Sequence, residues 1–207
     1  MKIAVFGATG TVGKLVVEEC LAKGAEVTAV ARHPERLRQN DANLQRVVAD
    51  VTVADERIQR AIEGCDAVII ALGDGMKGGV RHTGTQNIID AMKVSGVRRL
   101  ICQSTLGAGD SFDNLNWLWR FVFRVPLRRA MADHTRQERA VRDSGLDWTI
   151  VRPAAFTDGE KTQTYRHGFD RFAKQLTLKI SRADVADFLV KQIHGREYLR
   201  QTPALSY

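Results

Sequence analysis

The chain has 207 residues, of which 44% are hydrophobic and 27% charged, and its formal net charge is +7. This composition is typical of a globular domain with a sizeable core, and it excludes an intrinsically disordered chain. A hydrophobic strand pattern starts at the second residue, so we expect no signal or transit peptide and a cytoplasmic protein.

The positive charge is dispersed along the chain. It occurs in pairs, such as Arg98–Arg99 and Arg128–Arg129, without a basic run. We interpret it as a solvated surface that favours anionic small molecules, and we expect no nucleic-acid partner. The cysteines are few and lie far apart in apolar segments, which favours reduced core thiols over disulfides or a zinc site. They are Cys20, Cys65 and Cys102.

A glycine-rich turn dominates the N-terminal region. The sequence Gly-Ala-Thr-Gly-Thr-Val-Gly at 7–13 joins a hydrophobic run at 2–6 to an amphipathic run at 14–21. In a strand–turn–helix unit, Gly7 permits the tight turn, Gly10 lets a diphosphate approach the backbone, and Gly13 allows close helix–strand packing. The helix N-terminus then directs free N–H groups at the anion. The stretch predicts a dinucleotide site, although its spacing differs from G-x-G-x-x-G and a purely structural turn is the alternative.

The second predicted strand, residues 25–31, ends at a basic side chain. NAD sites commonly place an acidic residue here, about 20 residues beyond the glycine turn, to hold the ribose hydroxyls. This chain has Arg32, followed by Arg36 and Arg38, and a guanidinium suits a 2′-phosphate. We therefore predict NADP rather than NAD, with Arg32 and then Arg36 as its ligands. The alternative is that these arginines face solvent.

Strands and helices alternate through the next hundred residues. Strands are predicted at 44–51, 66–73, 98–104 and 147–151, and helices at 55–62, 83–95 and 128–144. This order predicts an α/β fold with a doubly wound, Rossmann-like parallel sheet, in which ligands lie over the carboxyl ends of the strands. Asp50 and Val51 fall at such an end, where an adenine would lie. We expect one domain over 1–207.

Two segments depart from the alternation and are predicted to form substrate-side loops, 106–127 and 154–180, the second within a small C-terminal lobe. Residues 114–126 contain Trp117 and Trp119, but they are too few to span a bilayer. They could line a pocket for a planar ligand, form a subunit contact, or lie on a membrane surface. We expect no integral membrane segment, and a monomer or weak homo-oligomer.

Three shorter features bear on the site. Ser104 ends a predicted strand and could bind a substrate carbonyl or a nicotinamide carboxamide, or simply cap the strand. Arg152–Pro153 is predicted to be an exit turn toward the nicotinamide. Ser181 is predicted to cap a helix with Asp184 three residues later, so Asp184 is interpreted as structural.

Taken together, the ordered motifs resemble those of the atypical short-chain dehydrogenase/reductases, and most closely the biliverdin-IXβ reductase/flavin reductase group. The motifs are GATGTVG at 7–13, ADV at 49–51, ALG at 71–73, QST at 103–105, SGLDWTIVRP at 144–153 and SRADVA at 181–186. The resemblance implies a Rossmann-like domain that binds NADPH and reduces flavins or biliverdin.

The resemblance also implies site residues. The expected cofactor contacts, with Arg36 and Pro153 added from their positions, are Gly7, Thr9, Gly10, Thr11, Val12, Arg32, Arg36, Asp50, Val51, Leu72, Gly73, Ser104 and Pro153. Ser104 matches the active-site serine, and His134 matches a histidine near the nicotinamide. An imidazole that titrates near neutrality is a plausible donor, but His134 could equally be an exposed histidine paired with Glu138.

The chain departs from related enzymes in two places. Conventional members use a tyrosine followed four residues later by lysine, but Phe169 and Thr202 occupy the fourth place after Tyr165 and Tyr198. The acceptor would then be stacked on the nicotinamide and protonated by solvent. Residues 154–155 are alanines where the group has a substrate-side histidine, which counts against biliverdin.

We therefore predict an NADPH-dependent reductase of a planar conjugated acceptor, such as a flavin or a tetrapyrrole. The main alternative is a non-catalytic NADP-binding sensor or assembly factor. Sugar-nucleotide epimerisation is less favoured, because that chemistry normally uses the absent tyrosine.

Overall fold

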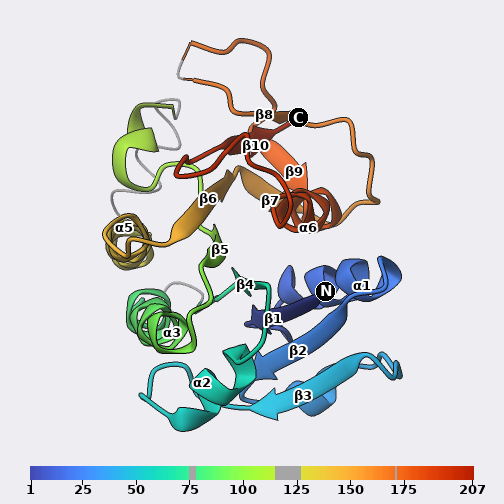
Figure 1. The fold of residues 1–207 in the computed structure, drawn as a ribbon. Coiled ribbons are helices and arrows are strands. Elements are labelled where there is room, and N and C mark those ends of the chain that lie inside the picture. Colours follow the sequence, from blue (N-terminus) through green and yellow to red (C-terminus); the bar gives the residue numbers. More distant parts are fainter. Residues whose placement is uncertain (75–77, 115–126, 171) are drawn as a thin grey trace.

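The computed structural model describes residues 1–74, 78–114, 127–170 and 172–207. Within them, eight strands form a central sheet in the order β3-β2-β1-β4-β5-β6-β10-β8, parallel except for β8 (Figure 1). The strands are β1 Lys2–Phe6, β2 Glu26–Ala31, β3 Leu44–Val48, β4 Ala67–Ile70, β5 Arg99–Gln103, β6 Asp147–Pro153, β8 Arg166–His167 and β10 Ala204–Ser206. The strand order reverses between β1 and β4, which is where doubly wound sheets bind ligands.

Helices cover both faces of this sheet (Figure 1). They are α1 Gly13–Ala22, α2 Glu56–Ile62, α3 Val80–Ser95, α5 Arg128–Arg142 and α6 Arg182–Lys191. Side chains of β1 alternate between two cores: Ile3 and Val5 pack with α1 and α6, whereas Ala4 and Phe6 pack with α2 and α3. Because β1 is buried on both faces, its sequence is a continuous apolar run. A mostly parallel sheet with helices on both faces is the predicted doubly wound α/β fold, which is thus confirmed.

Two predicted strands are shorter than expected. The strand predicted at 44–51 ends at Val48, and the one predicted at 66–73 covers only Ala67–Ile70. Val51, Ala71 and Leu72 are nevertheless buried. Their apolar side chains line a cleft beyond the strand ends, and hydrophobicity alone does not separate that role from continued pairing.

The prediction of an exit turn at Arg152–Pro153 is wrong. Both residues belong to β6, because β10 pairs alongside them: Arg152 N–H donates to Pro203 O at 2.9 Å and Ala154 N–H to Leu205 O at 2.9 Å. Pro153 lies between these two donors, at a position where β10 requires no N–H, so a proline is tolerated within this strand. Strand β10 was absent from the sequence prediction.

The remaining C-terminal elements are short. Strands β7 Ala155–Thr157 and β9 Lys179–Ser181 form a separate parallel pair. The cap predicted for α6 is confirmed, because Ser181 Oγ accepts from Asp184 N–H at 3.0 Å. The buried Asp184 carboxylate in turn binds Thr162 and Tyr207, which agrees with a structural role. The three cysteines are buried and free, as expected for core thiols.

Candidate functional site

The glycine turn joins β1 to α1 with very little space around it. Gly7 has a φ of +78°, and a Cβ added to it would overlap the carbonyl group of Ala71 beyond β4. A Cβ on Gly13 would likewise overlap the Gly7 carbonyl. These positions therefore admit only glycine, and they hold the start of α1 directly against the ends of β1 and β4.

The first turn of α1 leaves backbone donors available. Gly10 N–H donates to Gly7 O at 2.9 Å and Lys14 N–H to Gly10 O at 3.1 Å, but no described residue accepts from the N–H groups of Thr11, Val12 or Gly13. Val12, the N-cap, makes no side-chain cap, and no acidic residue lies in the first turn of the helix. Free donors at a positive helix end suit an anion such as a diphosphate.

A cavity of about 260 Å³ opens beside this turn, at the carboxyl ends of β1, β2 and β4. Its lining brings together eight of the residues predicted from sequence, namely Gly7, Thr9, Gly10, Arg32, Asp50, Val51, Leu72 and Gly73. Thr52 and Val80 also line it and were not predicted. The predicted residues Thr11, Val12, Arg36, Ser104 and Pro153 are not part of this lining.

Arg32 and Asp50 lie at one end of the cleft. Asp50 Oδ1 accepts from Thr52 Oγ1 at 2.7 Å and from Thr52 N–H at 2.9 Å. These bonds lower the pKa of Asp50, and the nearby charge of Arg32 lowers it further, so this carboxyl is ionised at neutral pH. Arg32 is exposed and forms no ion pair with a described residue, whereas Arg36 is exposed outside the cleft on the 3-10 turn Pro34–Arg36.

Ser104 follows β5, on the side of β4 away from β1. Its N–H donates to Val151 O at 2.8 Å, and its Oγ lies 3.4 Å from Nδ1 of His134 on α5. Both side chains are buried, at 1% and 8% exposure. The structure thus brings together the two residues predicted to be catalytic, and the alternative of an exposed His134 is wrong.

The expectation that His134 titrates near neutrality is also wrong. Burial, reinforced by the positive charge of Arg81, lowers the pKa of His134 to about 3, against an opposing effect of Asp133. The imidazole is therefore neutral at physiological pH. It can donate one hydrogen bond and accept one, but it does not serve as a cationic acid.

Residues adjacent to His134 fasten α5 to the start of α3. The Asp133 carboxylate accepts from the backbone N–H groups of Arg81 and His82, each at 3.1 Å, and so caps α3. Gln137 Nε2 donates to Thr85 Oγ1 at 3.0 Å. Sequence reasoning missed these contacts, because the partners are about fifty positions apart and neither local pattern identifies the other.

A buried ion pair fixes the other end of α5. Arg152 on β6 donates from Nε to Glu138 Oε1 at 2.9 Å and from Nη2 to Oε2 at 2.5 Å. Burial opposes the charge of Arg152, but Glu138 and Asp110 raise its pKa above the ordinary value. Glu138 is thus engaged with Arg152 and does not pair with His134 in the way the sequence alternative required.

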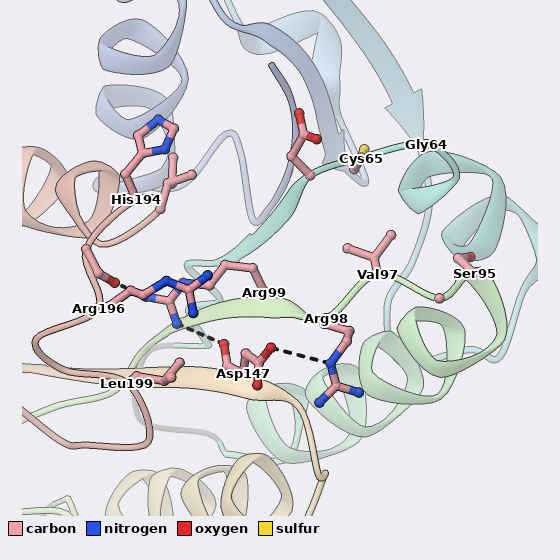
Figure 2. Close-up of a pocket in the computed structure, with 14 residues that line it drawn as sticks. Gly64, Cys65, Ser95, Val97, Arg98, Arg99, Asp147, His194, Arg196 and Leu199 are labelled. Carbon is pink, nitrogen blue, oxygen red and sulfur yellow. Dashed lines mark hydrogen bonds and ion pairs between the residues drawn. The ribbon is translucent and has the colours of Figure 1, made fainter.

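A second and larger cavity, of about 570 Å³, lies at the opposite edge of the sheet, where β4, β5 and β6 begin (Figure 2). Arg99 is half-buried there and donates to Gln192 O, Asp147 O and Thr149 Oγ1 at 3.2, 2.8 and 2.9 Å. Its guanidinium ties the end of α6 to β6. No residue of the predicted site lies at this edge. Arg98 and Arg99 direct their donors at the protein itself, whereas Arg196 is exposed.

Some predictions fall outside the described residues, among them all those on the aromatic segment 115–126. Across the described ranges, no helix is both long and apolar enough to cross a membrane. The same ranges contain no group of histidine, cysteine and acidic side chains suited to a metal ion. Tyr165 donates to Asp187 Oδ2 at 2.7 Å in the C-terminal region.

Comparison with known proteins agrees with this geometry. An uncharacterized chloroplastic protein of Arabidopsis thaliana is 30% identical over 176 residues, which cover 78% of this chain and 61% of the plant protein. A Streptomyces griseus (4-alkanoyl-5-oxo-2,5-dihydrofuran-3-yl)methyl phosphate reductase is 31% identical over 74% of this chain and 48% of its own length. This chain thus spans about half to three-fifths of the length of these two relatives.

Among solved structures, anaerobilin reductase of Escherichia coli O157:H7 has the same fold, with a TM-score of 0.81 and 24% identity over 99% of this chain and 96% of its own. A family model described as NAD(P)H-binding matches residues 7–196, from the glycine turn to just beyond α6. The chain belongs to this NAD(P)H-binding family.

Proposed function

We propose that this protein is an NADPH-dependent reductase that transfers a hydride to a planar conjugated acceptor, such as a flavin or a tetrapyrrole. The observation that carries the proposal is that the cofactor cleft and the Ser104–His134 pair, the two half-sites of the proposed reaction, lie side by side at the carboxyl edge of the sheet. The cleft with Arg32 lies over β1, β2 and β4, and the Ser104–His134 pair lies at the end of the neighbouring β5. The names of the Streptomyces and Escherichia relatives, both reductases, support it.

The residues present fit a dinucleotide. Glycine at positions 7 and 13 lets the start of α1 pack directly against the ends of β1 and β4, because a Cβ at either position would overlap backbone atoms. The free N–H groups of Thr11, Val12 and Gly13 supply donors for a diphosphate. Arg32, with no described ion-pair partner, is the proposed ligand of a 2′-phosphate, and this is our reason for preferring NADPH to NADH.

When bound, NADPH supplies the hydride, and the chain supplies position and polarity. With the proton on His134 Nδ1, the imidazole donates to Ser104 Oγ and leaves the Ser104 hydroxyl free to donate to an acceptor carbonyl. Because His134 is neutral, this pair orients the acceptor, and the proton that completes the reduction comes from water. No tyrosine acid is required, and Tyr165 is already engaged with Asp187.

The test is turnover of NADPH with free flavins, followed as loss of NADPH absorbance. We expect reduction of at least one flavin, with NADH as a poorer donor and with Ser104→Ala lowering the rate. Matched turnover by a Ser144→Ala control, which removes a buried hydroxyl bound to Val141 O beyond the far end of α5, separates a site effect from a folding defect. Tight NADPH binding without reduction of any flavin, quinone or tetrapyrrole would contradict a reductase and support the sensor alternative.

A further inference from the structure

Arg81 is a buried arginine between the two halves of the proposed site. It follows Val80, which lines the cofactor cleft, and it lies in the first turn of α3. The residue is 7% exposed, and its backbone N–H donates to Asp133 Oδ2 at 3.1 Å. Its charge is close enough to His134 to lower the pKa of that imidazole. Arg81 is therefore linked to the cleft through the preceding residue, Val80, and to α5 through Asp133, the residue before His134.

The guanidinium of Arg81 is incompletely matched. Its Nε and Nη1 atoms are buried, and neither has a hydrogen-bond partner among the described residues. The nearest carboxylate, Asp133, lies 3.8 Å from Nη1, beyond hydrogen-bond distance, and its oxygens already accept from two backbone N–H groups. Buried donors are normally paired, and unpaired ones on a charged group are especially unfavourable.

In two other arginines of this fold, the guanidinium donors are paired with protein acceptors. Arg152 directs Nε and Nη2 at the Glu138 carboxylate, and Arg99 directs all three of its nitrogens at carbonyl and hydroxyl oxygens. Asp133 accepts the two backbone N–H groups that fasten α3, and it also gives Arg81 a buried counter-charge at 3.8 Å, with Asp74 as a further acidic neighbour. The Arg81 charge is therefore partly balanced by the fold, but its Nε and Nη1 donors have no acceptor among the described residues.

We propose that Arg81 binds an anionic substituent, a phosphate or a carboxylate, on the acceptor held by Ser104 and His134. This inference rests on the proposed function and adds a substrate class to it: acceptors with a negative group beyond the conjugated ring. A guanidinium with free N–H donors in a site shielded from water recognises such groups strongly. Arg32 is then the proposed ligand of the cofactor phosphate, and Arg81 that of the acceptor anion.

The experiment uses pairs of acceptors that share a ring system and differ in one charge type. FMN is compared with riboflavin, which lacks the phosphate, and biliverdin with its dimethyl ester, which lacks the carboxylates. For the wild type we expect the KM of one charged member to be at least about tenfold below that of its uncharged partner. Selectivity in the flavin pair identifies phosphate, and selectivity in the tetrapyrrole pair identifies carboxylate.

The variant Arg81→Gln should bring that KM ratio close to one, and Arg81→Lys should restore part of it. Arg136→Gln is the matched control, because Arg136 is an exposed arginine on α5 whose Nε contacts only Ala132 O. It should keep the wild-type ratio. Measurements near neutral pH keep His134 uncharged in all variants. A general folding defect would change both members of a pair alike and leave the ratio in place.

Failure of the reductase proposal is distinguishable from failure of this one. If no acceptor is reduced, binding of the same four probes to the NADP⁺-loaded protein is measured by fluorescence quenching. Preference for a charged member that Arg81→Gln removes still supports anion recognition by Arg81. Equal affinity or equal KM within both pairs, the same ratio in wild type and Arg81→Gln, or no binding of any probe would overturn it.

Discussion

At the amino edge of the central sheet, where its parallel strands begin, Arg99 donates to Asp147 O (Figure 2). It also donates to Gln192 O and Thr149 Oγ1, and so joins the end of α6 to β6. At the carboxyl edge, Arg32 forms no ion pair with a described residue and Arg81 keeps two buried nitrogens unmatched. The amino edge has the larger of these two cavities, 570 Å³ against 260 Å³, and Arg196, exposed in its lining, likewise forms no ion pair with a described residue. The difference between the two edges is the buried, unmatched guanidinium of Arg81, and this is our reason for proposing a ligand at the carboxyl edge.

The carboxyl edge has one exception to this contrast, the Arg152–Glu138 pair, and breaking it should give the largest effect on stability. Glu138→Gln leaves Arg152, 4% exposed, with the exposed Asp110 as its remaining carboxylate partner, and we expect a loss of about 3 kcal/mol in the free energy of unfolding, the lower end for a broken buried pair. Urea denaturation measures it. Glu56→Gln, which removes an exposed pair with Arg60, is the control and should change stability by less than about 1 kcal/mol. Similar losses in both variants would contradict the structural role of the buried pair.

Replacing Arg99 at the amino edge should lower the stability of the fold without changing the affinity for the cofactor. Arg99→Gln removes several charged hydrogen bonds, which should cost about 2–3 kcal/mol in denaturation experiments, with the NADPH dissociation constant unchanged. Arg196→Gln, an exposed arginine that lines the same cavity, should stay within about 0.5 kcal/mol of the wild type. A weakened NADPH affinity in Arg99→Gln would remove the distinction between the two edges.

The opposite pattern is expected for Arg32. Arg32→Ala should weaken NADPH binding by about 1.5–3 kcal/mol, because one charge-assisted contact is lost, while NADH binding and stability stay nearly constant. Isothermal titration with both nucleotides provides the comparison, and Arg38→Ala, an exposed neighbour outside the cleft, is its control. Equal weakening for NADH and NADPH would refute contact with a 2′-phosphate.

The buried His134 should make stability depend on pH. Its pKa is lowered from 6.5 to about 3, so below pH 6.5 the unfolded chain binds a proton that the native chain does not. Stability should therefore fall as the pH decreases from 6.5 toward 3, with roughly 2 kcal/mol lost at about pH 5. This part of the pH dependence should be absent in His134→Asn. Parallel stability curves for the two proteins between neutral pH and pH 5 would show that His134 titrates normally.

Sequence patterns predicted the sheet because they are local. The glycine turn, the alternation of apolar runs and the Ser181 cap each depend on residues a few positions apart. They also placed Ser104, Arg32 and the glycines at one sheet edge, since the carboxyl ends of parallel strands share an edge.

The surroundings of His134 depend instead on long-range packing. His134 packs against Ser104, it lies near the charge of Arg81, and Glu138 pairs with Arg152 instead of with the imidazole. Each of these contacts joins two different helices or strands, so the local sequence pattern does not predict it. The imidazole was therefore expected to titrate near neutrality, although the fold keeps it neutral. Likewise, β10 is three residues long and is held by β6 more than by its own pattern.

The carboxylate of Asp133 has a mechanical consequence for the proposed site. It binds the N–H of Arg81, the residue next to Val80 in the cleft wall, and it precedes His134 in α5. A nucleotide that displaces Val80 would therefore move α5 as well, because Asp133 binds two backbone N–H groups of α3 and Gln137 binds Thr85. Occupancy of either part of the site should accordingly change the affinity of the other, and by the same factor in both directions.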